Sequence, residues 1–149
     1  VKIYGNDGGK HKTTRDAIEN FVQNLLMGCA SARFHRPTSG QGLNEIARAV
    51  IKTMREVTDN TDHFNARAAN DLLDGREEGE AYCRAIPGKQ YVIYFPEGGE
   101  VSVDLSPLGK TRITWYDVLG ADSEEKEISG SENTIITAPG QGHWIGVIK

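Results

Sequence analysis

Long apolar runs and paired cysteine motifs are both lacking in this chain of 149 residues. The longest apolar run covers only a few positions, at residues 91–95, which is too short to span a bilayer, so we expect no membrane partner. The two cysteines, Cys29 and Cys83, lack the CxxC spacing, and we expect two small buried side chains rather than a metal site or a disulfide. The chain begins with Val1 and shows no signal-peptide pattern, which predicts a processed chain or a piece of a longer one.

A surplus of basic residues is also lacking. The 17 Lys and Arg residues are outnumbered by 21 Asp and Glu residues, which gives a formal net charge of -4. Because phosphate binding requires a basic face, we expect no nucleic acid partner. The sequence contains no GxGxxG, Walker or GxSxG motif, and its histidines are isolated from one another in the sequence, so we expect no cofactor and no metal.

The first half of the chain has a helical period. Thr13 and Thr14 predict a helix start, Asp16 suits the first turn, and Gly28 marks the end. The apolar positions of this first helix are Ile18, Phe21, Val22, Leu25, Leu26 and Cys29. Those of a second helix are Leu43, Ile46, Ala47, Val50, Ile51, Met54 and Val57.

Short strands are predicted at residues 1–4 and 32–34, which makes the order strand, helix, strand, helix, as in a parallel α/β fold. Two parallel strands cannot bury two amphipathic helices, so the sequence predicts that further strands come from elsewhere. Residues 58–80 are polar and are interpreted as a surface linker, with Leu72 and Leu73 fixing it to the body. We therefore expect a division into a partial (β/α) segment with its linker, 1–79, and a second domain, 80–149.

The second domain has the period of strands. Pro87 and Gly88 form a good central pair for a type II turn between strands at 81–86 and 90–95. Further alternating segments occur at 101–105, 112–116, 126–129, 134–137 and 143–148. Short strands with turn residues at regular spacing predict a small antiparallel β-sandwich or barrel. The predicted class is therefore α+β, a partial βαβα segment followed by a β-sandwich.

The densest polar cluster lies at the carboxyl end of the second predicted strand, where Arg33, His35 and Arg36 could hold an acidic or polyhydroxyl ligand. An Arg–acid pair that ties strand to helix explains the same residues equally well. Asn6 and Asp7 follow the first predicted strand and could line the same rim, although turn chemistry explains them too. Because glycoside hydrolysis needs two facing carboxylates, Asp7 is a single catalytic candidate without an evident partner.

The aromatic residues of the predicted sandwich either belong to its core or lie on its surface, where they could stack on sugars. By alternation, Trp115 shares a face with Ile113 and should be buried. Tyr116 lies on the other face beside Arg112, and we expect these two to form an exposed surface that could bind a ligand.

Several motifs together resemble a known arrangement. The most specific are Tyr-x-x-Tyr-x-Pro-x-Gly-Gly at residues 91–99 and Trp-Tyr at 115–116, and weaker ones lie at 31–37, 42–45, 70–73 and 80–83. The chain resembles the C-terminal end of bacterial glycoside-hydrolase-like proteins, in which a TIM barrel precedes a β-sandwich catalogued as a collagen-binding domain of a collagenase. The resemblance implies that residues 1–4 and 32–34 are the seventh and eighth barrel strands and that the acid/base residue lies on an earlier strand.

The resemblance implies a carbohydrate-active protein, secreted or periplasmic, whose sandwich is an accessory domain that supports the barrel or binds carbohydrate or matrix. The expected partners are a polysaccharide or glycan, and either the remaining barrel portion or another copy of the chain. Two alternatives stay open. One is a stand-alone polysaccharide- or collagen-binding module, and the other is a glycosidase completed by another chain.

Overall fold

The computed structural model describes residues 14–29, 32, 45–120 and 123–149. Both predicted helices are confirmed, whereas the predicted strands at 1–4 and 32–34 lie outside these residues apart from Ala32. No helix in the described part of the chain is long and apolar enough to cross a membrane. The elements are α1 (Thr14–Leu26), α2 (Glu45–Asp59), β1 (Arg67–Ala68), the 3-10 helix η1 (Asn70–Leu72), β2 (Leu73–Asp74), β3 (Tyr82–Ile86), β4 (Gln90–Phe95), β5 (Glu100–Val103), β6 (Lys110–Asp117), β7 (Ser123–Ser129), β8 (Thr134–Thr137) and β9 (Trp144–Ile148).

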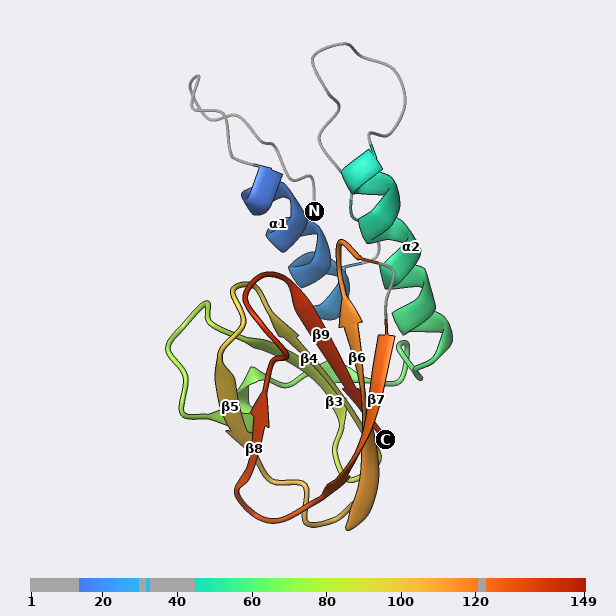
Figure 1. Cartoon of the computed structure of the whole chain (residues 1–149). Helices are drawn as coiled ribbons and strands as arrows, with labels where there is room; N and C mark the ends of the chain where they lie inside the picture. Colours follow the sequence, from blue (N-terminus) through green and yellow to red (C-terminus); the bar gives the residue numbers. More distant parts are fainter. Residues whose placement is uncertain (1–13, 30–31, 33–44, 121–122) are drawn as a thin grey trace.

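The strands form the predicted antiparallel β-sandwich (Figure 1). The larger sheet has the order β1-β3-β4-β9-β6-β7, and the smaller sheet has the order β2-β5-β8. The predicted turn between β3 and β4 is present, because the Lys89 amide donates to the Ile86 carbonyl at 2.9 Å and Gly88 has a φ of 75°. Alternating side chains therefore point from each strand to one of two faces of the larger sheet.

The first core lies between the two sheets. Tyr91, Ile93 and Phe95 point into it from β4, and Trp115 joins from β6, as its alternation predicts. The rings of Phe95 and Trp115 lie 5.8 Å apart at an angle of 50°. Residues from the smaller sheet close this core from the other side, and they include Val101, Val103 and Ile136.

The second core lies between the two helices and the outer face of the larger sheet (Figure 1). Its helical members are Ile18, Phe21, Val22, Leu26, Val50, Met54 and Val57. Its members on the side of the sheet are Val92, Tyr94, Tyr116, Ile145, Val147 and, directly after β6, Val118. All six residues of β4 are buried as a result. The prediction that the helices need strands from elsewhere to cover their apolar faces is wrong for the described residues, because a sheet has two faces and the sandwich leaves one of them free for the helices.

The predicted surface linker contributes to both sheets, which corrects that interpretation. Arg67 and Ala68 of β1 pair with Ala85 and Arg84 of β3, and β2 pairs with β5. Leu73 is buried in the first core and Leu72 packs against it, which confirms that this dileucine fixes the segment to the body. Two-residue strands are too short to show an alternating pattern in the sequence. The predicted division of the chain between residues 79 and 80 remains a prediction.

One buried cation fastens the helices to the sheet. Arg84 of β3 donates from Nη1 to the Leu26 carbonyl at 3.0 Å, and from Nε and Nη2 to the His63 carbonyl at 3.0 and 2.8 Å. A positive charge at the last carbonyls of α1 also complements the helix dipole. Burial lowers the pKa of Arg84 from its ordinary value. Gly28 ends α1 as predicted, with a φ of 84°, and any side chain there would meet this guanidinium.

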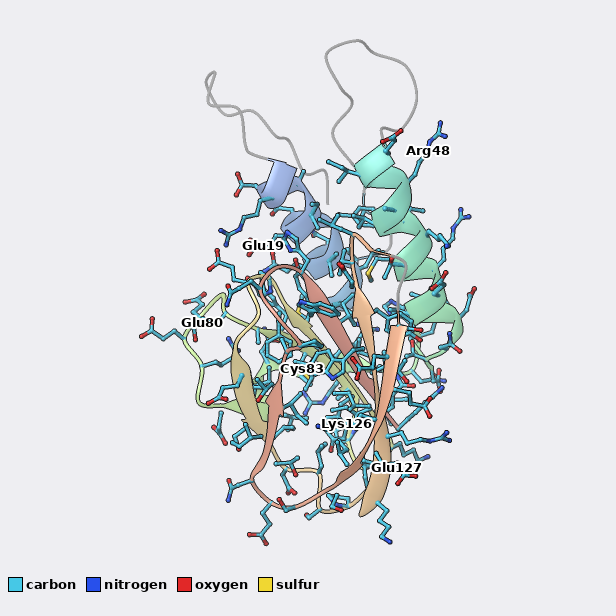
Figure 2. All side chains as sticks on the ribbon, viewed as in Figure 1. Glu19, Arg48, Glu80, Cys83, Lys126 and Glu127 are labelled. Carbon is cyan, nitrogen blue, oxygen red and sulfur yellow. The ribbon has the colours of Figure 1, made fainter. Side chains whose placement is uncertain are left out.

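The two cysteines are free. Cys83 is completely buried in the first core, and burial raises its pKa to about 12. Figure 2 shows Cys83 in the interior of the sandwich, whereas Lys126 and Glu127 lie on the outermost strand β7. Cys29 is half-buried and its thiol donates to Asn24 Oδ1 at 3.2 Å. Both cysteines therefore pack as small side chains.

Candidate functional site

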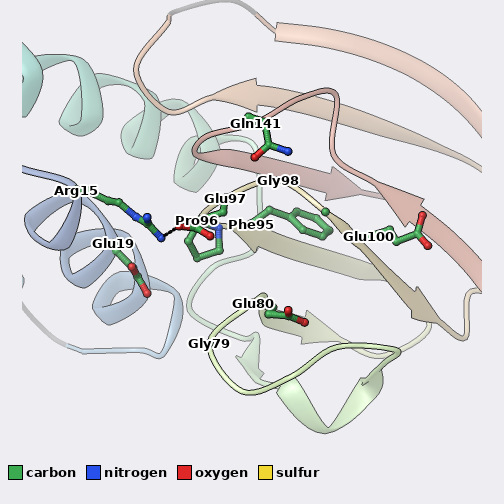
Figure 3. Close-up of a pocket in the computed structure, with 11 residues that line it drawn as sticks. Arg15, Glu19, Gly79, Glu80, Phe95, Pro96, Glu97, Gly98, Glu100 and Gln141 are labelled. Carbon is green, nitrogen blue, oxygen red and sulfur yellow. Dashed lines mark ion pairs between the residues drawn. The ribbon is translucent and has the colours of Figure 1, made fainter.

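A pocket of about 330 Å³ lies where α1 meets one end of the sandwich (Figure 3). Its walls come from the first turns of α1, the loop before β3, the loop between β4 and β5, and the loop before β9. The polar side chains that line it are Arg15, Glu19, Glu80, Glu97, Glu100 and Gln141. We refer to this site as the junction pocket.

The loop between β4 and β5 forms much of the pocket wall and contains the Pro-x-Gly-Gly end of the sequence motif. Gly98 and Gly99 have φ values of 77° and 97°, a region that favours glycine. A side chain on Gly98 would collide with the backbone of Gly140, and the Gly99 carbonyl accepts from the Ala138 amide at 2.9 Å. These glycines are therefore needed to bring two loops together at the pocket.

The charges of the junction pocket are mostly negative, since four carboxylates face one guanidinium. Arg15 forms an ion pair with Glu97 and so connects α1 with the loop. Both side chains are more than half exposed, at 53% and 61%, so this pair contributes at most about 1 kcal/mol. Glu80 Oε2 accepts from the Glu77 amide at 2.6 Å, and Glu19 Oε1 accepts from the Tyr82 hydroxyl at 3.5 Å.

Such a pocket can accept hydrogen bonds from hydroxyl or amino groups, because ionised carboxylates are acceptors only. Among the described residues, no group of three or more His, Cys, Asp or Glu side chains could hold a metal ion. Glu80, Glu97 and Glu100 are exposed to water. The general acid of a glycoside hydrolase is typically a carboxyl group withdrawn from water, whereas these three side chains are exposed and only Glu19 is half-buried.

An aromatic layer lies under α1 in the second core. Tyr82 stacks on Tyr94 and Tyr94 stacks on His143, each with ring centroids 6.1 Å apart. The Tyr94 hydroxyl and His143 Nδ1 are hydrogen-bonded at 2.7 Å. Burial raises the pKa of Tyr94, whereas burial and then Arg15 lower that of His143, so both groups are neutral near neutral pH. Sequence spacing could not reveal this bond, because 49 residues separate the partners and only the pairing of β4 with β9 brings them together.

A second pocket of about 580 Å³ is lined mainly by residues of β6 and β7 and by Lys149 after β9. Arg112 lines it, together with Lys110, Glu127 and Lys149. Arg112 Nη1 is paired with Glu125 Oε1 at 2.9 Å, and both side chains are more than half exposed. Arg112 is therefore at the surface, as expected.

No protein-family model and no curated protein matches the sequence. Among solved structures, the chain is similar to a glycoside hydrolase family 5 protein from Bacteroides vulgatus ATCC 8482, with a TM-score of 0.67 and 13% identity over 97% of this chain and 38% of that one. It is also similar to a second protein described as a glycoside hydrolase, with a TM-score of 0.61 and 14% identity over 87% of this chain and 31% of that one. The chain shares its fold with part of these glycoside hydrolases. It spans about a third of their length.

This likeness confirms the coarse part of the resemblance found in the sequence, namely its relation to glycoside hydrolase structures. The collagen-binding character of the sandwich stays a prediction, because neither neighbour is described in those terms. The structural likeness, at sequence identities of only 13% and 14%, establishes the fold alone. The activity has to be argued separately.

Most of the predicted site residues lie outside the described part of the chain. These are Asn6, Asp7, Arg33, His35 and Arg36. Their proposed roles in ligand binding and, for Asp7, in catalysis therefore stay predictions.

The expected exposure of Tyr116 is wrong. Tyr116 does lie on the same face of β6 as Arg112, but it is only 7% exposed because helix α2 covers that end of the face. Burial raises its pKa. Tyr116 and Arg112 therefore do not form one exposed surface. The junction pocket was missed because its acids come from separate elements, Glu19 from α1, Glu80 and Glu97 from two loops and Glu100 from β5, and nothing local in the sequence connects them.

Proposed function

We propose that this chain is a non-catalytic portion of a larger glycoside-hydrolase-like protein, in which the β-sandwich is an accessory domain that supports the catalytic barrel or binds carbohydrate. The observation that supports this most is the likeness to a family 5 glycoside hydrolase over 97% of this chain but only 38% of that protein. The likeness covers the helices as well as the sandwich.

A supporting role agrees with the second core. Leu26 and Val50 on the helices are completely buried against strand residues such as Ile145. A domain that binds two helices through a continuous apolar core fixes their position as firmly as a domain interior does. Arg84 adds hydrogen bonds from the sheet to the end of α1 and to the turn after α2.

The chemistry of the junction pocket favours an accessory role over a catalytic one. Three of its four acids, Glu80, Glu97 and Glu100, are exposed, and Glu97 is paired with Arg15. The fourth, Glu19, is half-buried and accepts a hydrogen bond from Tyr82. We expect that the 149-residue chain releases no reducing sugar from neutral polysaccharides or aryl glycosides. Release of sugar that is lost in the Asp7→Asn variant would contradict the proposal, and so would activity that appears only in a dimer resolved by light scattering.

A further inference from the structure

Among the described strands, β1 and β7 form the edges of the larger sheet, and β2 and β8 form those of the smaller sheet. Short edges and charged edges are two ways in which proteins prevent a further strand from pairing. β1 and β2 have two residues each, and β7 contains the consecutive charged residues Glu124, Glu125, Lys126 and Glu127. The edge strand β8 has neither protection, since it consists of Thr134, Ile135, Ile136 and Thr137.

The open edge of β8 carries backbone groups that point away from β5. The Ala138 amide donates to the Gly99 carbonyl at 2.9 Å, which fixes the residues of β8 that face β5. Because hydrogen bonding alternates along an antiparallel pair, the amides and carbonyls of Ile135 and Thr137 face the other way. Within the described part of the chain these groups have no hydrogen-bond partner, and both residues are exposed, Ile135 at 56%. An extended strand can therefore pair with β8 without displacing a bond.

Two copies of β8 are complementary to each other. In an antiparallel pair with Ile136 of each copy on the two-fold axis, Ile135 of one copy lies opposite Thr137 of the other. Both of these positions then exchange amide and carbonyl hydrogen bonds, and the smaller sheets of the two copies join into one continuous sheet. Pro139 follows shortly after β8 and has no amide hydrogen, so the pairing ends at the same residue in both copies.

The charges favour β8 over β7 as a contact between copies. The Gly130 amide donates to the Gly109 carbonyl at 2.6 Å, so by the same alternation the outward-facing positions of β7 include Glu125 and Glu127. Two copies of β7 would place these carboxylates opposite one another, which is destabilising. Residues 133–142 include no charged side chain, so two copies of β8 meet without such repulsion.

We propose that β8 is a site of self-association, at which two copies of this chain pair antiparallel through their open β8 edges. The contact spans the four residues of β8 in each copy, whereas a stable complex uses about 20–30 residues on each side, so the dimer is weak and reversible. The proposal rests on the backbone and charge of the sheet edges and is independent of the proposed function.

NMR spectra and sedimentation velocity of the 149-residue chain at increasing concentration test this contact. Between about 0.05 and about 1 mM protein, we expect the amide signals of Ile135 and Thr137 to shift and the mean sedimentation coefficient to rise. Thr137→Pro removes an amide that has no partner in the described part of the chain, so it should retain the fold and weaken self-association at least about tenfold. Ile135→Glu should weaken it similarly, because it places two carboxylates on a diagonal of the paired strands, about 7–8 Å apart.

Glu127→Pro is the matched control, because it makes the same backbone change at an outward-facing position of the charged edge β7. It should leave self-association unchanged. A chain that stays monomeric at about 1 mM overturns the proposal, and so does a folded Thr137→Pro or Ile135→Glu variant that associates as strongly as the wild type. Concentration-dependent shifts confined to residues outside β8, or an equal loss of association in Glu127→Pro, would place the contact elsewhere and refute it as well.

Discussion

The two faces of the larger sheet differ in what covers them. The inner face packs against the three-stranded sheet, and the outer face packs against two helices that precede the sandwich in the sequence. Strand β4 serves both cores, since Ile93 points inward and Val92 and Tyr94 point outward. A sheet whose inner face is already covered by a second sheet can therefore also bind helices on its outer face. Without those helices, the apolar residues of the outer face would be exposed to solvent.

The largest effects should come from opening each core in turn. Ile93→Ala in the first core and Leu26→Ala in the second both truncate completely buried side chains, and each should lower the free energy of unfolding by about 2–5 kcal/mol. Hydrogen exchange should separate them. We expect Ile93→Ala to accelerate exchange in strands and helices alike, and Leu26→Ala to accelerate it mainly in α1 and α2. Equal acceleration of all elements in both variants would mean that the two cores form one cooperative unit.

Loss of the Arg84 hydrogen bonds to the Leu26 and His63 carbonyls should give the next largest decrease in stability. Arg84→Met retains much of the side-chain volume but leaves the carbonyls of Leu26 and His63 without their donor. We expect a loss of about 2–3 kcal/mol in urea unfolding. Arg112→Met makes the same chemical change at an exposed site and should cost less than about 1 kcal/mol. Similar losses in the two variants would show that Arg84 does not join the helices to the sheet.

A smaller effect depends on pH and concerns the second core alone. The pKa of His143 in the folded chain lies below its ordinary value of 6.5, first because of burial and then because of Arg15. The unfolded chain therefore takes up the proton first, so stability should be complete above about pH 7, fall as the pH drops through 6.5, and level off below the pKa of the folded state. His143→Gln should reduce this slope in unfolding measured between about pH 7.5 and about pH 5. His63 has a pKa lowered in the same direction and should account for part of the remaining slope, and an unchanged slope in His143→Gln would refute the role of His143.

The smallest effect is expected at the rim between helix and sandwich. The Arg15–Glu97 pair is exposed, so a double-mutant cycle with Arg15→Ala and Glu97→Ala should give a coupling energy of about 0.2–1 kcal/mol that disappears at high salt. A coupling that persists in salt and exceeds this range would place the pair among the interactions that hold the second core together.

The strands and helices were largely predictable from the sequence because their signals are local. Gly28 follows the end of α1 and Gly88 lies in the turn between β3 and β4, as their positions in the sequence predict. Alternation correctly predicts that Trp115 is buried. The covering of the outer face was not predicted. Alternation assigns Tyr116 to the correct face but cannot tell whether that face meets water or a helix, which depends on contacts between distant segments. The uninterrupted apolar run at residues 91–95 was the available signal, because a strand buried on both faces loses its alternation.

The junction pocket and the bond between Tyr94 and His143 depend on the order of strands in the sheet. Sequence reasoning treated His143 as isolated, because nothing local connects it with β4. The segment at residues 67–74 was assigned to a linker for a similar reason, since two-residue strands acquire their partners only through the register of β3 and β5.

The shared use of β4 has a consequence for how this sandwich can be exchanged between proteins. A gene fusion cut at residue 80 would discard β1, β2 and both helices, and would leave Val92, Tyr94, Tyr116, Ile145 and Val147 facing solvent. Such a fragment would expose a large apolar patch and would tend to aggregate in isolation. A transfer of the sandwich to another protein that keeps it soluble would therefore have to include the two helices that precede it.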